Sequence, residues 1–318
     1  MFFLPFFLFA IWSSCFPLGK IAMDSSTPLF FTATRMLLAS ILILGYLFIR
    51  KRKDLKISIK QGFAICILAI LSMYLTNALE LYGLKHLSAA KTCFLYSLTP
   101  FFAAIFSYIH FREKMNFKKM IGMSIGFIGI LPVFFFQGGS EKLTSSFLHI
   151  SLPEIAIIVA VIFSVYGWIL LRILVKNNNV SPLTANGWGM LIGGIFALVH
   201  SYFFDSWNPL PITSGHTAGF LQGLGLITLL SNVLCYNLYG YLLKRYTATF
   251  MSFVGLLSPV FASLSEWLLL KTPPSPRILA STCVIIFGLW IVYREELKQG
   301  YIIKGSKSLS DKNVKTTA

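Results

Sequence analysis

Long apolar stretches alternate with short polar connections along almost the whole chain. A helix needs about 20 apolar residues to cross roughly 30 Å of hydrocarbon, and ten stretches meet this requirement. Because lipid offers the backbone no hydrogen-bond partners, each stretch is expected to be a helix. The ten predicted spans cover residues 2–22, 28–49, 61–84, 88–110, 118–136, 153–173, 182–204, 217–243, 247–270 and 277–293.

The fourth and ninth predicted spans resemble each other. Pro100 lies in LYSLTPFFAA, and Pro259 lies in VGLLSPVFAS, 159 residues further along the chain. Internal repetition of this kind is typical of membrane carriers. Each half holds five spans, so the second copy must enter the membrane from the opposite side, which predicts inverted repeats. The expected division is a first repeat at residues 1–136, an external linker at 137–152, a second repeat at 153–293 and a basic tail at 294–318.

The distribution of charge predicts the orientation. The net charge is +16, but only 12% of the residues are charged, against about 25% in soluble domains. With the N-terminus inside, 20 of the 27 lysines and arginines fall in cytoplasmic connections or in the tail, as the positive-inside rule requires. We therefore attribute the basic character to membrane orientation and not to nucleic-acid binding. Both termini are expected in the cytoplasm, and the polar tail is expected to be disordered.

The remaining motifs exclude several classes of protein. The five cysteines are scattered through apolar runs without a C-x-x-C pair, and the five histidines show no metal-ligand spacing. No Walker loop or nucleophile elbow is present, so the sequence predicts neither a cofactor nor an ATP-driven pump. The first apolar run lacks a basic start and a small-x-small cleavage site, so we interpret it as a retained span and not as a signal peptide.

Four ionisable residues within predicted spans carry the main functional hypothesis. Glu80, Lys91 and Glu266 each lie about four residues, or roughly 6 Å, from the outer end of a predicted helix. Arg35 lies deeper. A buried unpaired charge is costly, so such residues are candidates for a substrate or ion pathway, with snorkelling to the interface as the alternative. Glu80 and Lys91 flank a tight turn and could pair. For Arg35 the alternative is a structural bond to a neighbouring span.

Amides, aromatic rings and prolines within spans add further candidates. Intramembrane asparagines (Asn77, Asn186, Asn232, Asn237) either bond helices together or line a polar cavity. Mid-span aromatic rings either pack or hold a substrate ring or cation. Mid-span prolines remove backbone hydrogen bonds and are predicted hinges, because two of them match between the halves. The substrate-binding candidates are Trp12, Phe16, Asn77, Glu80, Lys91, Tyr96, Tyr166, Tyr236 and Asn237; Arg35 and Glu266 are structural or coupling candidates, and Pro17, Pro100 and Pro259 are hinge candidates.

Over residues 4–293 the chain resembles the EamA family of the drug/metabolite transporter superfamily. Arg35 in its apolar setting is similar to that family's second span. The stretch around Pro100, with Glu113 thirteen residues later, follows the pattern of the third and fourth spans. The second copy keeps Pro259 but has Thr272 where the family usually has glutamate. Any role for that carboxylate is therefore confined to one half.

The resemblance implies two inverted five-helix units around a central cavity. Family substrates include amino acids, nucleotide-linked metabolites, S-adenosylmethionine and amphiphilic drugs. Charges of both signs near an aromatic-rich cavity favour a zwitterion. The predicted function is alternating-access transport of an amino acid or a derivative such as S-adenosylmethionine across the cytoplasmic membrane, driven by a proton or by exchange. Glu80 is the predicted partner of the substrate ammonium, and Lys91 or Arg35 the predicted partner of its carboxylate.

Two alternatives stay open from the sequence. Among carriers, the alternative is efflux of amphiphilic cations. Outside the carriers, the chain would be a non-transporting membrane subunit or a membrane-embedded enzyme, although no polar groups converge at one depth beyond the ionisable residues near the outer side. The expected partners are a small-molecule substrate, the lipid bilayer and a coupling proton, without nucleic acid; the sequence does not specify an oligomeric state.

Overall fold

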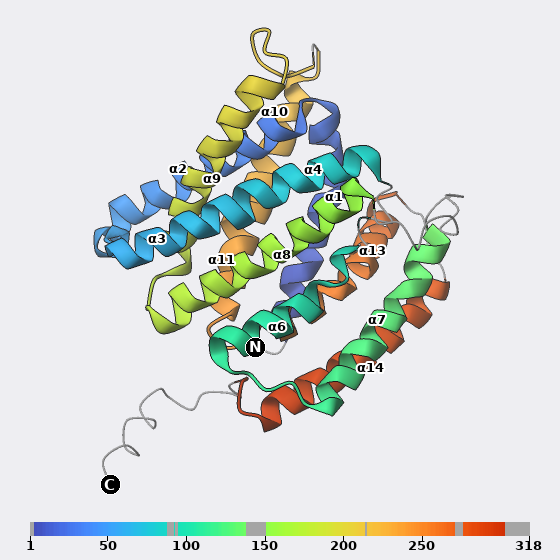
Figure 1. The fold of residues 1–318 in the computed structure, drawn as a ribbon. Helices are drawn as coiled ribbons and strands as arrows, with labels where there is room; N and C mark the ends of the chain where they lie inside the picture. Colours follow the sequence, from blue (N-terminus) through green and yellow to red (C-terminus); the bar gives the residue numbers. More distant parts are fainter. Residues whose placement is uncertain are drawn as a thin grey trace.

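The computed structural model describes residues 3–87, 92, 95–137, 151–213, 215–270 and 276–302, except for the side chains of 16–24, 84–85, 132–137, 263, 266–270 and 276–279. The described backbone is built from helices that cross one another obliquely (Figure 1). Its only extended pairing is an isolated antiparallel bridge between Ser26 and Ile212. Within this part of the chain the fold is therefore all-α, as predicted.

The first half of the chain forms two single helices, one long composite helix and two more helices. These are α1 (Leu4–Asp24), α2 (Pro28–Arg50), the 3-10 turn η1 (Arg52–Leu55), the composite of α3 (Ile59–Leu68), the π segment η2 (Ala69–Leu75) and α4 (Thr76–His86), then α6 (Thr99–Phe111) and α7 (Phe117–Gln137).

The second half also contains single helices and one composite helix with a π segment inside it. Its elements are α8 (Leu152–Arg172) with the π segment η4 (Ile173–Asn177), α9 (Pro182–Phe204), the composite of α10 (Thr217–Ile227), the π segment η5 (Thr228–Cys235) and α11 (Tyr236–Leu242), then α12 (Ala248–Val254), the 3-10 turn η6 (Gly255–Leu257), α13 (Ser258–Leu270) and α14 (Pro276–Lys298).

Local sequence explains where several helices begin. The hydroxyl of Ser58 accepts from the backbone N–H of Gln61, whose side chain accepts in return from Ser58 N–H, so α3 starts with a capping box. At the starts of α9 and α12, the hydroxyls of Ser181 and Thr247 each accept from a backbone N–H of the first turn. Each cap satisfies an N–H group that the first turn of a helix leaves without a partner.

Several helices have the length and polarity of membrane spans. Among the described residues, the stretches that meet both criteria are Pro28–Arg50, Ile59–Gly83, Leu152–Asn177, Pro182–Phe204 and Thr217–Leu242, and shorter apolar helices cover Leu4–Cys15, Thr99–Phe111 and Ala248–Ala262.

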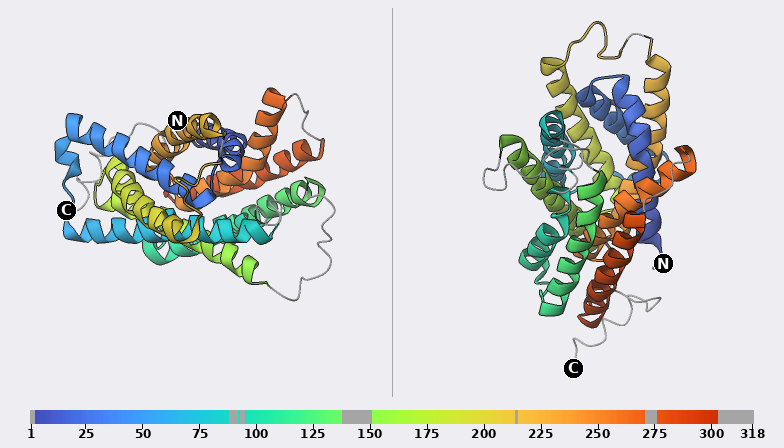
Figure 2. Two further views of the ribbon diagram at one scale, coloured as in Figure 1. Left: turned by 90° about the horizontal axis from the view of Figure 1, so that it is seen from above. Right: turned by 90° about the vertical axis from the view of Figure 1, so that its right-hand side faces the viewer.

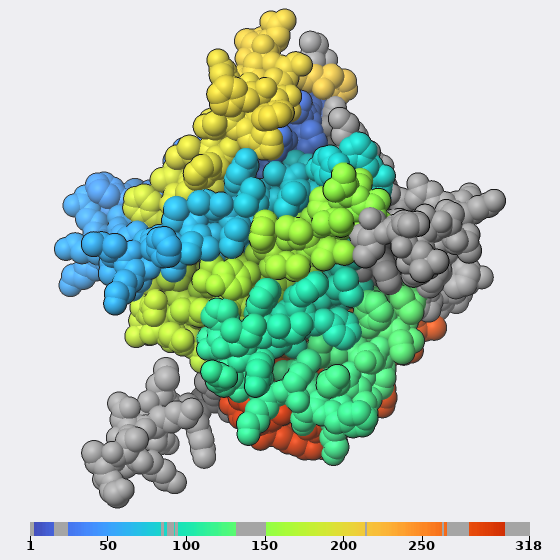
Figure 3. Space-filling model, viewed as in Figure 1, coloured from blue at the N-terminus to red at the C-terminus, as the bar shows by residue number. Residues whose placement is uncertain are grey.

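The outer faces of these helices are apolar. In the space-filling view, α3–α4, α8 and α6 form successive oblique ridges on one face (Figure 3). Large apolar side chains are exposed along these ridges, including Phe63, Ile105 and Ile155. So much exposed apolar surface would be a liability in water, whereas against lipid it is the expected surface.

Helices of the two halves pack against each other in pairs. The α2 helix runs along α9, and α7 runs along α14 (Figures 1 and 2). In the same way α4 packs on α8, α1 on α10 and α13, and α6 on α12. Every pair joins a helix before residue 137 to a helix after residue 151. The two halves therefore share one interface that extends through the molecule.

Glycines allow the closest of these approaches. A Cβ atom added to Gly288 of α14 would lie 2.6 Å from the backbone oxygen of Gly122 in α7, and one added to Gly126 would overlap Phe253. Likewise, a Cβ at Gly193 of α9 would lie 2.8 Å from the Cβ of Met73. Small residues let helix backbones approach closely in membranes, and Gly122, Gly126 and Gly193 lie at such contacts.

The predicted spans are interrupted at matching places. The π segments η2 and η5 begin at Ala69 and Thr228, 159 positions apart, which is also the separation of Pro100 and Pro259. Each proline is the second residue of a helical element, α6 or α13. The missing N–H is harmless there, because the first helical turn has no partner for it. The hinge role of these prolines stays a prediction.

The last helix is longer than expected. The predicted tail begins at residue 294, but α14 continues to Lys298, and the side chains of Glu295 and Glu296 are buried. Glu295 accepts a hydrogen bond from Nδ2 of Asn116 at 2.7 Å, and Glu296 pairs with Lys119. These contacts with the first half explain the extra helical turn. Residues 303–318, where disorder was predicted, lie outside the described residues.

Candidate functional site

Arg35 on α2 joins the two halves of the protein. Its Nη2 donates to Oδ1 of Asn77 at 3.1 Å, and its Nη1 donates to Oδ1 of Asn232 at 3.4 Å. Asn77 is the second residue of α4, which continues from the π segment η2, and Asn232 lies within η5. A guanidinium has five N–H donors, so these bonds orient Arg35 and leave donors for an anionic group.

A carboxylate lies close to Arg35. The positive charge of Arg35 is near enough to interact with Glu80 on α4 and with Tyr236 on α11. Glu80 in turn accepts a hydrogen bond from the hydroxyl of Tyr96 at 2.9 Å. The structure therefore brings a guanidinium, a carboxylate and two tyrosine side chains together between helices α2, α4 and α11. The predicted partner of Glu80, Lys91, lies outside the described residues.

An aromatic cluster adjoins this charged group. It consists of Trp12 on α1, Trp168 on α8, and Tyr236 and Tyr239 on α11. The ring centroid of Tyr236 lies 5.2 Å from that of Trp12 and 5.4 Å from that of Trp168. Trp168 and Tyr239 are 4.2 Å apart. Tyr236 thus belongs to both groups and connects the aromatic cluster to Arg35. Rings at these separations present faces and edges that favour flat or cationic groups.

Two asparagines beside the cluster connect helices. Nδ2 of Asn186 donates to the backbone oxygen of Tyr236 at 3.0 Å and to Oδ1 of Asn237 at 3.1 Å. Nδ2 of Asn237 donates to the backbone oxygen of Val233 at 2.7 Å. These bonds attach α9 to the junction of η5 and α11. Asn237 was a candidate for substrate binding, and the contacts in this structure fit the interhelical alternative better.

The model of the EamA-like transporter family matches residues 2–135 and 151–294. This chain belongs to the EamA-like transporter family. It is therefore a multi-pass membrane protein, which is consistent with a bacterial cell membrane, and its family members are transporters and not enzymes.

Curated relatives cover nearly the whole transporter. An S-adenosylmethionine/S-adenosylhomocysteine transporter of Chlamydia muridarum is 40% identical over 302 residues, which is 95% of this chain and 94% of the relative. A protein of the same name from Chlamydia trachomatis serovar D is 39% identical and covers 95% of this chain and 91% of the relative. A solved crystal structure with 12% identity superposes with a TM-score of 0.74 over 93% of this chain and 97% of that one, which supports the fold alone.

Of the other predicted site residues of this EamA transporter, one packs against α6, and the side chains of the others lie outside the described part of the structure. Tyr166 packs against Phe106 at 5.4 Å and His110 at 5.5 Å, both on α6. Phe16 and Pro17 are placed within α1, and Glu266 within α13, but their side chains are outside the described part.

Sequence reasoning did not select three residues of this site. Asn232 was recognised as an intramembrane amide without an assigned partner, because nothing in the hydropathy pattern marks a π segment. Trp168 is one of the mid-span aromatic rings for which both packing and substrate stacking were open, and Tyr239 looks like an ordinary packing aromatic in a chain with 30 phenylalanines. The signal that could have found Trp168 and Tyr239 is the side of α8 and of α11 on which each ring lies, compared with the side of α1 that carries Trp12.

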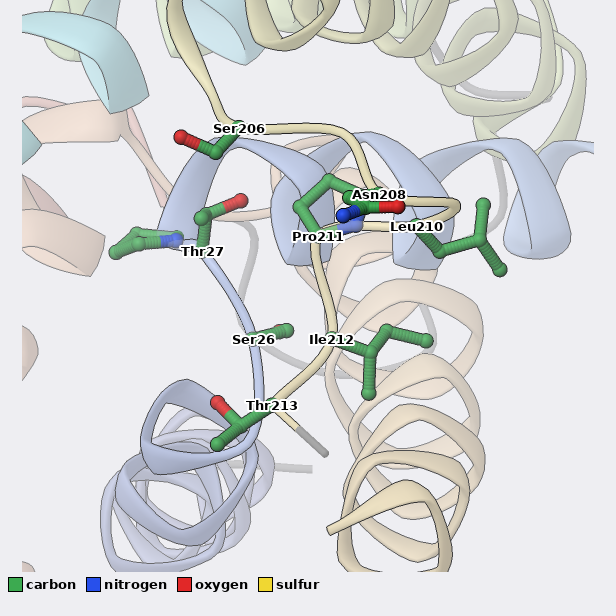
Figure 4. Close-up of a pocket in the computed structure, with 9 residues that line it drawn as sticks. Ser26, Thr27, Ser206, Asn208, Leu210, Pro211, Ile212 and Thr213 are labelled. Atoms are coloured by element: carbon green, nitrogen blue, oxygen red, sulfur yellow. The ribbon is translucent and has the colours of Figure 1, made fainter. Parts of the chain in front are cut away.

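A shallow pocket lies apart from this group, at the connections between α1 and α2 and between α9 and α10 (Figure 4). Its volume is about 480 Å³. The Thr27 hydroxyl donates to Asp205 at 2.8 Å, and Ser201 donates to the same carboxylate at 2.6 Å. Arg35 is seven residues further along α2. These bonds tie two connections together, so we assign the pocket a structural role.

Proposed function

We propose that this transporter is a secondary carrier for S-adenosylmethionine and S-adenosylhomocysteine, working by alternating access in the cytoplasmic membrane. The observation that carries the proposal is that Arg35 is hydrogen-bonded to an amide of each half, with a carboxylate and an aromatic cluster beside it. These three groups match the carboxylate, the ammonium and the adenosyl sulfonium of the substrate. The names of the chlamydial relatives support the same substrate pair.

Arg35 is the proposed partner of the substrate carboxylate. Asn77 and Asn232 hold the guanidinium in place, and a planar guanidinium binds a carboxylate through two parallel hydrogen bonds. Because one amide comes from each half, a carboxylate bound to Arg35 would affect the contacts of both halves at once. That is the property a carrier needs if substrate binding is to change the arrangement of its halves.

Glu80 is the proposed partner of the substrate ammonium. Its bond from Tyr96 orients the carboxylate, and Arg35 nearby compensates its charge. The two side chains are thus arranged as a receptor for an amino-acid group, negative at one end and positive at the other. Glu80 is also the proposed carrier of a coupling proton, if transport is driven by protons and not by exchange.

The aromatic cluster is the proposed site of the adenosyl sulfonium. Trp12, Trp168, Tyr236 and Tyr239 offer π-faces within about 6 Å of one another. A cation over such a face gains roughly 0.5 to 2 kcal/mol. The uncharged thioether of S-adenosylhomocysteine loses only this contribution, so one site can take both compounds.

The proposed topology has ten spans in two inverted repeats, at residues 1–136 and 153–293, with both termini in the cytoplasm. Its support is the equal separation of the two π segments and of the two prolines, together with the helix pairs that join the halves. Carriers of this kind place the substrate at the repeat interface, where helices are interrupted. Arg35, Asn77 and Asn232 lie at such a place.

Uptake by the purified protein in liposomes tests the function. Labelled S-adenosylmethionine should enter saturably, and S-adenosylhomocysteine should compete, whereas adenosine or methionine alone should compete weakly because each lacks part of the match. Vesicles preloaded with S-adenosylhomocysteine distinguish exchange, which accelerates uptake, from proton coupling, which responds to an imposed pH gradient. Transport of lipophilic cations without selectivity would contradict the proposal and favour drug efflux.

A further inference from the structure

A buried ion pair connects the two halves at the end of the molecule predicted to face the cytoplasm. Nη2 of Arg172, at the end of α8, lies 2.5 Å from Oε1 of Glu113, which follows α6. The two side chains are 1% and 4% exposed. The guanidinium also lies over the ring of Phe111, 4.2 Å from its centroid. The pair thus closes the space between α6 and α8 with two charges that have no access to water.

This pair is only partly satisfied. Among the described residues, Oε2 of Glu113 and both Nε and Nη1 of Arg172 are buried without a hydrogen-bond partner. The free energy needed to remove two charges from water exceeds the stabilisation from one short contact, unless the remaining polar atoms of the pair are also hydrogen-bonded. Admission of water to this place would hydrate those atoms and offset the loss of the pair. The closed contact is therefore less stable than it would be with every polar atom bonded.

A second ion pair at the same end differs in its surroundings. Nζ of Lys119 on α7 lies 2.6 Å from Oε1 of Glu296 on α14, and both side chains are buried. Glu296 also accepts from the hydroxyl of Thr247, the residue that caps α12. Here the two backbones are already in contact along α7 and α14 through Gly122 and Gly288. Separating this pair would require breaking that whole interface.

We propose that Glu113 and Arg172 form an inner latch, which closes the cytoplasmic end of the transport pathway and separates in every cycle, while Lys119 and Glu296 form a fixed clamp. The proposal rests on the carrier function and on the predicted orientation, but not on the identity of the substrate. The second repeat has Thr272 at the position that matches Glu113, so the sequence provides this carboxylate at one end only.

Thiol labelling at position 107 tests the latch without any substrate. Ser107 is fully buried, and its backbone oxygen accepts from the N–H of Glu113. In a variant that lacks the five native cysteines and carries Ser107→Cys, a membrane-impermeant maleimide is applied to inside-out vesicles. We expect slow labelling with the latch intact. Glu113→Gln should make it about tenfold faster or more, because a lone buried charge strongly disfavours the closed state.

Matched variants separate the latch from general destabilisation. Glu296→Gln removes the corresponding carboxylate of the clamp and should leave the labelling rate within about twofold of the parent. The double variant Glu113→Gln with Arg172→Gln leaves no lone charge in the interior, so it should fold and still label fast. Exchanging the charges with Glu113→Arg and Arg172→Glu should restore slow labelling. Unchanged labelling in both the Glu113→Gln variant and the double variant, or an equal effect of Glu296→Gln, would overturn the proposal.

Discussion

Asn77 and Asn232 are 155 positions apart in the sequence, yet both accept hydrogen bonds from the guanidinium of Arg35. Asn232 lies within the π segment η5, and Asn77 lies two residues after the end of the π segment η2. π segments are uncommon and occur frequently at functional sites. In the proposed mechanism, the π segments η2 and η5 therefore help to place an amide from each half against Arg35, the side chain that binds the substrate carboxylate.

Replacing Arg35 should weaken substrate binding strongly. A hydrogen bond to a charged group contributes roughly 1.5 to 3 kcal/mol, so Arg35→Gln should raise the Kd for S-adenosylmethionine by about 10- to 100-fold. Arg35→Lys should recover little of this, because an ammonium lacks the planar fork. Titration of the purified protein measures both. Arg52→Gln, which removes an exposed arginine bonded to Phe48, is the control and should leave Kd unchanged.

Replacing Glu80 should affect both affinity and coupling. Glu80→Gln keeps the shape but removes the charge that faces the substrate ammonium, so the Kd should rise by about tenfold or more. If Glu80 carries the coupling proton, the pH dependence of uptake should flatten in the same variant. Tyr96→Phe removes only the bond that orients Glu80 and should reduce affinity a few-fold. Unchanged uptake and pH profile in Glu80→Gln would show that the assignment is wrong.

The aromatic cluster should distinguish the two proposed substrates. Trp168→Leu removes a π-face, and a cation–π contact is worth roughly 0.5 to 2 kcal/mol. The affinity for S-adenosylmethionine should therefore fall by about 2- to 30-fold more than that for S-adenosylhomocysteine, which has no sulfonium charge. Parallel titrations with both compounds measure the ratio. Trp290→Leu, at a half-exposed position on α14, should not change it, and an equal loss for both compounds would contradict the assignment.

Close packing of α7 on α14 should be sensitive to a single methyl group. Because a Cβ at Gly288 would meet the backbone oxygen of Gly122 at 2.6 Å, Gly288→Ala should force the helices apart. Overpacking of this kind typically costs about 1 to 3 kcal/mol, and the Tm in detergent should fall. At Gly225 of α10 an added Cβ meets nothing within 4 Å, so Gly225→Ala should leave the Tm unchanged or raise it.

The sequence was sufficient for the class of protein. Apolar length predicted an all-helical membrane protein. The resemblance of the stretch around Pro100 and Glu113 predicted the family. These features are local or periodic, so they can be seen in one chain without knowledge of which helices meet.

The site was less predictable, because its contacts depend on the angular position of each residue on helices far apart in the sequence. Arg35 was expected to have either a structural or a binding role, and its bond to Asn232 could not be inferred before η5 was known to be a π segment. Arg172 and Lys119 were counted only as cytoplasmic positive charges. Their burial against Glu113 and Glu296 depends on helix ends meeting across the two halves, which no hydropathy pattern reveals.

Counterflow of labelled S-adenosylmethionine into liposomes preloaded with S-adenosylhomocysteine tests the proposed function, with the unmodified protein and Arg35→Gln compared at equal protein content. From this proposal we expect saturable uptake by the unmodified protein that S-adenosylhomocysteine outside the vesicles inhibits, and loss of that uptake in the variant. The absence of saturable uptake by the unmodified protein, or equal uptake by both proteins, would contradict it.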